Sequence, residues 1–348
     1  MRAECERVIQ LFPALADQLR FSSSQPNSGF SGAGVFRFGG EFGDFALRAW
    51  PRKGLPLERI LGLHRLIQFV HWTGIKPISV PLANGDGTTI TEFNGRYWQL
   101  EPWMPGTADF HQHPSATRLK SAMKTLAECH MAASQFKTDS RTERWFGSSA
   151  ASFSPACQER HQQLAEWLEY RLDQVLSRLN TEPLDPFCGL THRIVNDVKR
   201  IGPIILSELQ KAAAYSVPLQ PCLRDIWHDH VLFTGDEVTG MIDLSACRTE
   251  NVATDLARLL GSLIGDETGQ WQIAINEYSR HRPLRQSERK LIVTLDRSAT
   301  VLSGLTWLRR RFLDQPAANY DWSSVLTRLK TIAARLHCLV SHSSRSSL

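Results

Sequence analysis

Three side chains in one short segment could hold a metal ion and support phosphoryl transfer. Asp225 follows an apolar stretch, His230 lies five residues later, and Asp243 lies thirteen residues beyond His230. Phosphoryl transfer from a nucleotide depends mostly on positioning and charge neutralisation, so it needs a carboxylate near the acceptor hydroxyl and oxygen or nitrogen ligands for a divalent ion. This segment is therefore the first candidate for a catalytic site.

The residues between His230 and Asp243 predict a β-hairpin. Two largely apolar runs, 231–233 and 238–242, flank a turn at 234–237 with the sequence Thr-Gly-Asp-Glu. A hairpin brings the residues that flank its two strands to the same end. We therefore expect His230 and Asp243 to lie close enough to share one ion.

The surrounding patterns predict two parts with different secondary structure. Short segments with alternating apolar residues and glycine punctuation indicate antiparallel strands, whereas apolar residues at helical spacing indicate helices. Strands are expected at 34–38, 45–50 and 97–100, and helices within 1–20 and at about 57–72, 115–135, 155–180, 190–215, 252–265, 269–280, 286–313 and 322–340. We therefore expect an α+β fold with a small strand-rich N-terminal lobe at 1–103, a larger mainly helical C-terminal lobe at 104–340, and a mobile polar tail at 341–348.

The segment around Asp225 is similar to the catalytic region of the aminoglycoside phosphotransferase and choline kinase superfamily, which is related to the protein kinases. That family has His-Gly-Asp-x-x-x-x-Asn, then a hairpin, then Ile-Asp-Phe, and this chain matches the spacing throughout. The resemblance places Asp225 on the catalytic aspartate and Asp243 on the metal-binding aspartate. Arg224 before Asp225 resembles the His-Arg-Asp of protein kinases, so Arg224 joins the candidate catalytic residues. The resemblance implies a two-lobed, protein-kinase-like fold.

Two departures from the family pattern bear on the metal site. His230 stands at the position of the family's asparagine ligand, and Leu244 stands where the family has phenylalanine after the metal-binding aspartate. A neutral imidazole is a softer ligand than an amide oxygen and suits Mn²⁺ or Zn²⁺ better than Mg²⁺. The resemblance therefore implies ATP and a divalent metal, Mg²⁺ or Mn²⁺, as cofactors, with His230 and Asp243 as metal ligands.

The resemblance also assigns residues that would contact the nucleotide phosphates. Gly32 and Gly34 lie in a glycine-bearing turn whose backbone N–H groups would cover the phosphates. Arg48 stands where the family places Lys or Arg against the α- and β-phosphates, and arginine can clamp phosphate bidentately. Glu58 is the only acidic residue in the following helix that could orient Arg48.

The segment after the last N-terminal strand resembles the hinge between the lobes of that family. The resemblance implies that the backbone carbonyl of Glu101 and the N–H of Trp103 meet the adenine edge. Pro102, which lies between them, has no N–H and cannot donate. The family pattern covers roughly residues 28–265, in the order glycine turn, basic strand residue, hinge and catalytic segment.

The composition disfavours several other classes of protein. The net charge of +5 arises from 40 basic and 35 acidic residues, a mild excess that predicts no nucleic-acid partner. No apolar stretch reaches the 18 residues of a membrane helix, so no membrane association is expected. The seven cysteines are scattered without Cys-x-x-Cys spacing, which predicts neither a disulfide framework nor a zinc ribbon and fits a cytoplasmic protein.

Three functions remain open from the sequence. The first is an ATP-dependent phosphotransferase that acts on a hydroxyl of a small-molecule acceptor, whose identity the sequence does not reveal. The second is a nucleotide-binding module without activity, in which His230 marks an altered metal site and the protein acts by binding a partner. The third is a metal-dependent hydrolase using His228 and His230, because residues two apart in a strand face the same side. The presence of both Asp225 and Asp243 favours the first.

Overall fold

The structure is a computed structural model that describes residues 2–22, 33–180, 186–314 and 321–345. It divides into two compact units, and the predicted lobe boundary at residue 103 falls inside the first of them. That boundary therefore stays a prediction. The first unit comprises Met1–Ser148, Gln220–Thr249 and Gly269–Pro283, and the second comprises Ser149–Leu219, Glu250–Thr268 and Leu284–Leu348.

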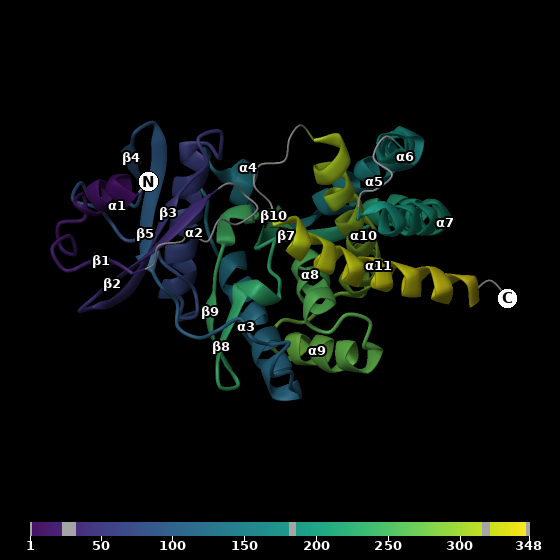
Figure 1. The fold of residues 1–348 in the computed structure, drawn as a ribbon. Helices are drawn as coiled ribbons and strands as arrows, with labels where there is room; N and C mark the ends of the chain where they lie inside the picture. The colour runs from purple at the N-terminus through teal and green to yellow at the C-terminus, as the bar shows by residue number, and fades with distance from the viewer. Residues whose placement is uncertain (1, 23–32, 181–185, 315–320, 346–348) are drawn as a thin grey trace. The chain divides into compact units, whose positions relative to one another are not determined.

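The first unit contains a five-stranded antiparallel sheet with the strand order β1-β2-β3-β5-β4 (Figure 1). The three strands expected from the sequence correspond to β2, β3 and β5, and two shorter strands complete the sheet. Their bounds are β1 Arg20–Phe21, β2 Gly34–Gly40, β3 Gly43–Ala49, β4 Thr91–Phe93 and β5 Arg96–Pro102.

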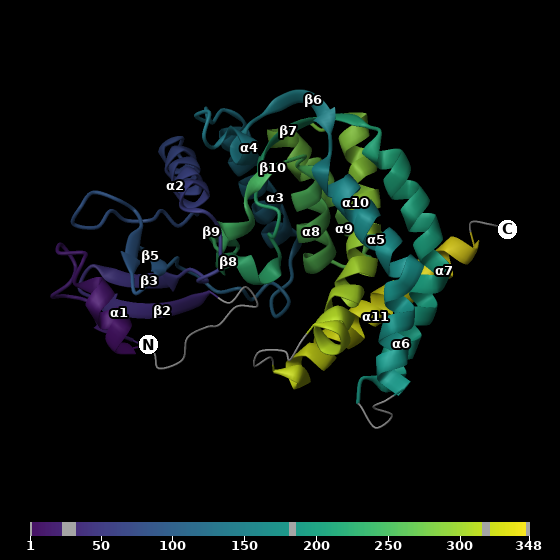
Figure 2. The same cartoon turned by 90° about the horizontal axis from the view of Figure 1, so that it is seen from above.

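The two faces of this sheet have different chemistry, because successive side chains of a strand point to opposite sides. On one face, Leu47 of β3 and Leu100 of β5 pack with the helix α1 (Arg2–Ile9) in an apolar core. On the other face, Arg48 of β3 lies opposite Gln99 of β5 in the strand register. That polar face is covered by the helix α2 (Leu57–Trp72), so α1 and α2 lie on opposite sides of the sheet (Figure 2).

The other elements of the first unit support the predicted hairpin. Its strands are β8 (Val231–Thr234) and β9 (Glu237–Met241), and isolated bridges join Phe233 to Thr107 and Met241 to Ile78. The hairpin therefore packs on segments that lie far away in the sequence. Besides α1, the helices of this unit are α2, whose bounds agree with the prediction, α3 (Ala116–Ser134), α4 (Glu143–Phe146) and nearly all of α9 (Thr268–His281).

The second unit is mainly helical, and its core is formed by apolar side chains from α5, α6, α7, α10 and α11. The helix predicted at 155–180 contains a π-helical turn at Trp167–Arg171, and the one predicted at 286–313 ends in another at Arg309–Leu313. The helices are α5 Pro155–Glu166, α6 Leu172–Asn180, α7 Cys188–Ala213, α8 Ala253–Leu263, α10 Gln286–Leu308 and α11 Trp322–Arg345. The strand β6 (Ser149–Phe153) lies in this unit, whereas β7 (Ser216–Cys222), with which it pairs, and β10 (Arg248–Glu250) each have residues in both units.

These elements confirm the predicted α+β class, with an antiparallel sheet near the N-terminus and helices toward the C-terminus. The C-terminal end differs from the expectation of a polar tail from residue 341, because α11 continues to Arg345. Residues 346–348 of that expected tail lie outside the described residues. Across the described ranges, no helix is both long and apolar enough to cross a membrane.

Candidate active site

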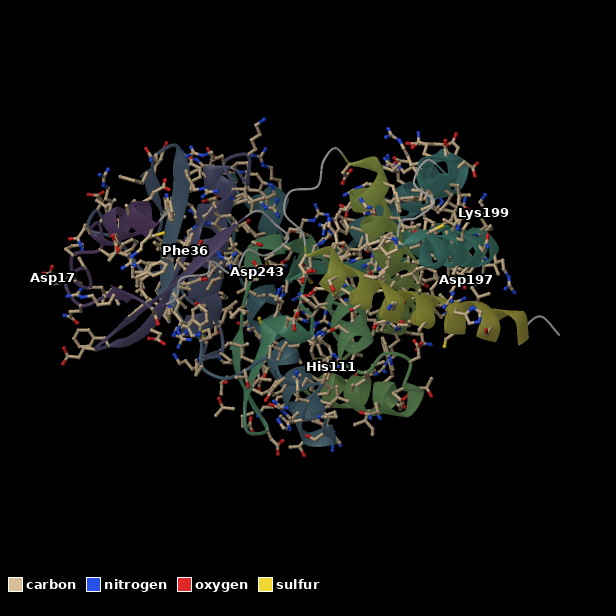
Figure 3. The ribbon with its side chains drawn as sticks, in the orientation of Figure 1. Asp17, Phe36, His111, Asp197, Lys199 and Asp243 are labelled. Atoms are coloured by element: carbon tan, nitrogen blue, oxygen red, sulfur yellow. The ribbon has the colours of Figure 1, made fainter. Side chains whose placement is uncertain are left out.

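The hairpin brings the two predicted metal ligands together. Val231 pairs with Met241, and beyond the strands the Ile242 N–H donates to the His230 carbonyl at 3.0 Å. Asp243 follows β9 closely (Figure 3), and its Oδ2 lies 3.9 Å from Nε2 of His230. One imidazole nitrogen and one carboxylate at this separation form a donor pair that fits a divalent ion such as Mn²⁺.

Two hydrogen bonds determine which nitrogen of His230 carries the proton. The indole N–H of Trp227 donates to Nε2 at 2.9 Å, and Nδ1 lies 2.7 Å from the backbone carbonyl oxygen of Asp225. An indole N–H can only donate and a carbonyl can only accept, so Nδ1 is protonated and Nε2 presents its lone pair. A metal ion bound through Nε2 would therefore replace the Trp227 hydrogen bond.

Asp243 is held in a backbone conformation that few residues other than glycine adopt, with φ of 55° and ψ of 60°. Its Oδ1 accepts from Nη1 of Arg48 at 3.0 Å and from the Ser245 hydroxyl at 3.0 Å. Burial acts to raise the pKa of Asp243, but the charge of Arg48, together with His230 and the Ser245 hydroxyl, outweighs it, and the net pKa is lowered. The carboxylate is therefore ionised and ready to bind a cation at neutral pH.

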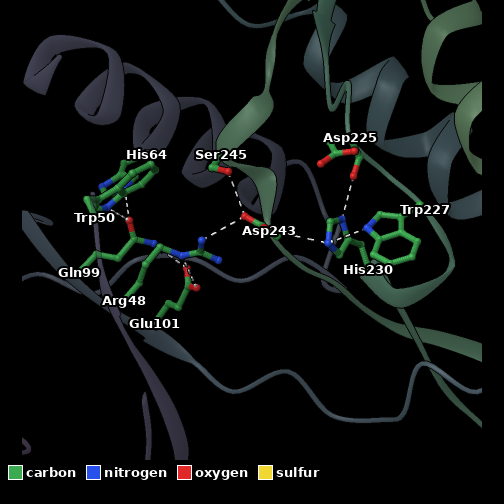
Figure 4. A network of polar contacts seen from close by, with 10 residues as sticks. All are labelled: Arg48, Trp50, His64, Gln99, Glu101, Asp225, Trp227, His230, Asp243 and Ser245. Carbon is green, nitrogen blue, oxygen red and sulfur yellow. Dashed lines mark hydrogen bonds and ion pairs between the residues drawn. The ribbon is translucent and has the colours of Figure 1, made fainter. Parts of the chain in front are cut away.

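Arg48 connects the sheet to the end of the hairpin (Figure 4). Its side chain is only 9% exposed, and its guanidinium meets two carboxylates: Nη1 bonds to Asp243, and Nε lies 3.8 Å from Oε1 of Glu101. The acid predicted to orient Arg48 was Glu58, which is exposed in the first turn of α2. Among the described residues no ion pair joins Glu58 to Arg48, so the structure brings Arg48 to Glu101 instead.

A buried chain of hydrogen bonds fixes the side chain of Glu101 (Figure 4). The amide of Gln99 donates to Oε2 of Glu101 at 2.8 Å, while its carbonyl oxygen accepts from the Trp50 indole at 2.8 Å and lies 3.0 Å from Nε2 of His64. The Trp50 donor identifies that Gln99 atom as oxygen, so Nε2 of His64 carries a proton. Nδ1 of His64 then accepts from the hydroxyl of Thr89 at 2.8 Å.

Burial shifts the two titratable groups of this chain. Burial raises the pKa of Glu101, and the nearby Arg48 charge and the Gln99 hydrogen bond oppose that shift only in part. Burial likewise lowers the pKa of His64 to about 4, although the hydrogen bond that its Nε2–H donates to Gln99 opposes that shift. His64 is only 1% exposed, so its ring is neutral at physiological pH.

The structure places the residues predicted to bind the nucleotide in several different ways. Gly32 lies outside the described residues, and Gly34 begins β2 opposite Ala49. The Trp103 N–H already donates to the Asp44 carbonyl at 2.9 Å as a continuation of the β3–β5 ladder. Hydrogen-bonded pairs alternate along such a ladder, which also directs the backbone groups of Glu101 toward β3. Contact of these two backbone groups with adenine would require the ladder to open.

The catalytic candidates lie in the loop before the hairpin. Asp225 is exposed, and Arg224 before it has a positive φ of 65°. Strained backbone of this kind is concentrated at functional sites. Residues His228–His230 form a 3₁₀ turn rather than a strand, and the His228 ring meets the His111 ring edge to face, with ring centroids 4.4 Å apart. This removes the strand geometry on which the two-histidine hydrolase depended.

A cavity in the first unit shows which residues the sequence reasoning missed. Polar residues on alternate positions of otherwise apolar strands were the available signal, because such residues share one face. Trp50 and Gln99 occupy such alternate positions. Nothing in the helical pattern of α2 distinguishes His64 from its neighbours. The lining includes Arg48, His64, Gln99, Glu101, Asp243 and Ser245.

The fold is similar to that of solved small-molecule kinases. It matches the amicoumacin kinase hAmiN in complex with AMP-PNP, Ca²⁺ and Ami with a TM-score of 0.63 and 15% identity, covering 97% of this chain and 96% of that chain. It matches the spectinomycin phosphotransferase APH(9)-Ia with ADP and spectinomycin with a TM-score of 0.58 and 14% identity, covering 94% and 97%. The fold is therefore protein-kinase-like, as the catalytic segment implied.

The sequence comparison identifies the family. Residues 23–291 match the phosphotransferase enzyme family, and the chain belongs to it. It is 24% identical to the homoserine kinase of Brucella anthropi over 250 residues, and 25% identical to that of Rhizobium rhizogenes over 248 residues. These alignments cover 70% of this chain and 63% and 64% of the two kinases, so they span less than two thirds of each relative.

Proposed function

We propose that this protein is an ATP-dependent phosphotransferase that transfers a phosphoryl group to a hydroxyl of a small molecule. The observation that carries the proposal is the continuous network from Arg48 through Asp243 to His230. It joins a basic strand residue suited to phosphate with two ligands suited to a divalent ion. Family membership and the protein-kinase-like fold support the same chemistry.

Each residue of the site has a proposed role. Asp225 would accept or orient the proton of the acceptor hydroxyl, with Arg224 beside it in the strained loop. His230 and Asp243 would hold the divalent ion, and Arg48 would contact the nucleotide phosphates. The ion, when bound, would neutralise negative charge on the β- and γ-phosphates. Gly32 and Gly34 would contact the phosphates through their backbone N–H groups.

We also propose how the nucleotide is held. Residues 1–103 would act as the nucleotide-binding lobe and residues 104–340 as the acceptor-binding lobe. The adenine edge would meet the backbone at Glu101 and Trp103, once the Trp103 N–H exchanges its bond to Asp44. The seven cysteines are scattered along the sequence without Cys-x-x-Cys spacing, which supports a cytoplasmic location.

Homoserine is the first acceptor to test. The two relatives compared above are homoserine kinases, and homoserine carries the primary hydroxyl that this chemistry requires. The two solved structures compared above contain amicoumacin or spectinomycin in complex with the kinase. The sequence of this chain, however, shows no dense acidic cluster in the helical part that would favour a cationic antibiotic.

The test combines calorimetry with an assay for ADP release. Wild-type protein is titrated with ATP in Mg²⁺, in Mn²⁺ and in chelator, and turnover is then measured with homoserine and with a panel of hydroxyl compounds. Metal-dependent ATP binding followed by acceptor-dependent ADP release would support the proposal. Binding without turnover on any acceptor would favour the nucleotide-binding module, and an activity that needs metal but no nucleotide would favour a hydrolase.

Variants separate the proposed roles. We expect Asp225→Ala to abolish transfer and keep ATP binding, because it removes only the group that handles the acceptor. Asp243→Ala should weaken ATP binding in the presence of metal by at least tenfold, about 1.4 kcal/mol, through loss of a charged metal ligand. Asp229→Ala is the matched control, since this carboxylate lies in the same loop and is half exposed. Equal loss of both functions in the Asp225 and Asp243 variants would contradict these roles.

A further inference from the structure

The guanidinium of Arg48 is held at two ends by carboxylates with different surroundings. Its Nη1 end bonds to Asp243, whose side chain is 30% exposed at the hairpin end. Its Nε end faces Glu101, whose side chain is 13% exposed and belongs to the central strand β5. One cation therefore contacts two carboxylates through different atoms.

The two carboxylates also differ in what else they do. Asp243 is one of the two proposed ligands for the divalent ion, so a bound ion would compete with Arg48 for its oxygens. Glu101 lies on the strand next to Arg48, where the register places Arg48 opposite Gln99 and Ala46 opposite Glu101. Its second oxygen is fixed by the Gln99 amide, which is itself fixed by Trp50 and His64. Glu101 is therefore the more rigid of the two partners.

The helix α2, which covers this face of the sheet, does not supply another acidic partner for Arg48. Glu58 is the only acidic residue of α2, and it is exposed at the first turn of that helix. The α2 residue that faces the sheet is His64, which binds Gln99 rather than Arg48. The carboxylate that could orient Arg48 thus comes from β5.

We propose that Glu101 is the positioning residue of Arg48: it holds the Nε end while the Nη1 end leaves Asp243 and turns to the nucleotide phosphates. This inference rests on the proposed function, because it assigns a task to Arg48 in nucleotide binding. In the free protein Arg48 bridges the two carboxylates, and when metal and nucleotide bind only the Glu101 contact remains. A buried, hydrogen-bonded carboxylate limits the orientations of the guanidinium and so reduces the entropy lost on binding phosphate.

The first experiment observes Arg48 directly. The Nε–H signal is recorded by NMR with ¹⁵N-labelled arginine and assigned from its loss in Arg48→Lys. We expect slow exchange of this proton with water in the wild type, with and without ATP and Mg²⁺, and exchange at least tenfold faster in Glu101→Gln. Glu92→Gln, an exposed carboxylate on β4 of the same sheet, is the control and should leave exchange unchanged.

The second experiment measures ATP affinity by calorimetry in Mg²⁺. We expect Glu101→Gln to weaken binding by about tenfold, because a buried ion pair, with Nε of Arg48 3.8 Å from Oε1 of Glu101, is replaced by a neutral contact. In the Arg48→Lys background, which lacks the Nε donor, the same change should weaken binding less than twofold. Such non-additivity is the signature of two residues that act as a pair.

The outcomes separate this inference from the proposed function. Weaker binding in Glu58→Gln but not in Glu101→Gln would overturn the inference and make the helix carboxylate the partner. Fully additive effects of Glu101→Gln and Arg48→Lys would also overturn it. If the wild type binds no ATP, the proposed function fails, while the comparison of Nε–H exchange between the free wild type and free Glu101→Gln still decides whether Glu101 holds Arg48. If Glu101→Gln does not fold, fast Nε–H exchange in the free wild type would still overturn the inference.

Discussion

Replacing His64 with glutamine should change the pH dependence of stability. The ring is buried against Gln99 and Thr89, and burial lowers its pKa in the folded protein to about 4 from an ordinary value of 6.5. Below pH 6.5 the unfolded chain therefore binds a proton that the folded protein rejects. Because the unfolded state then holds more protons, the free energy of unfolding falls as the pH falls.

The magnitude follows from the two pKa values. A shift from 6.5 to about 4 makes His64 lower the free energy of unfolding by roughly 2 kcal/mol between pH 7 and pH 4.5, with the loss complete below about pH 4. His64 is only 1% exposed, so solvent screening reduces this effect little. In His64→Gln the contribution is absent, although the variant is less stable at pH 7 because it loses part of the hydrogen-bonded chain.

The assay is urea denaturation at several pH values between 7 and 4.5, with unfolding monitored by tryptophan fluorescence. The measured quantity is the fall in unfolding free energy over this range in the wild type minus the fall in His64→Gln. His113→Gln, which removes a largely exposed histidine from the same unit, is the control and should keep the wild-type dependence. Equal pH dependence in the wild type and His64→Gln would refute the reasoning, because a neutral buried ring requires a difference.

Two further changes test the metal site and the second unit. Trp227→Phe removes the donor to Nε2 of His230 and should tighten Mn²⁺ binding, measured by calorimetry without nucleotide, by up to about tenfold; weaker binding would show that the indole supports the site. The buried carboxylate of Glu250 accepts from the Ser154 hydroxyl at one oxygen and from the Ala156 N–H at the other. Glu250→Gln leaves an amide with a single oxygen, which cannot accept at both positions. It should lower the free energy of unfolding by about 2 kcal/mol in urea denaturation, and a change below about 0.5 kcal/mol would contradict the assigned contacts.

Local patterns in the sequence were sufficient for the elements that carry the site. The helix α2 has the predicted bounds, because apolar residues at helical spacing form one stripe along it. The hairpin was also predictable, because two apolar runs flank a two-residue turn in which Gly235 has a positive φ of 60°. The proximity of His230 and Asp243 followed from that hairpin alone. These features depend on neighbours a few residues apart.

Other features depended on packing that no local pattern records. The sequence left 341–345 as tail, but α11 extends through them, continuous with the segment that buries Leu336 and Val340. The π-helical turns within the predicted long helices are likewise not visible in the apolar spacing. Adding residues to a helix that has already formed is cooperative, so α11 continues beyond its last buried turn although its final residues are weak helix formers.

The partners of Arg48 show most clearly what the sequence predicts and what only the tertiary structure determines. The residue types alone indicated a phosphate-binding arginine and an acid to orient it, and the following helix offered Glu58. Which acid faces Arg48 depends on the register of β3 and β5 and on the rotation of α2 about its axis, and these bring Glu101 to Nε. The contact with Asp243 spans 195 positions of the chain. A contact over such a distance arises from the packing of whole elements, because residues near each partner in the sequence carry no signal of the other.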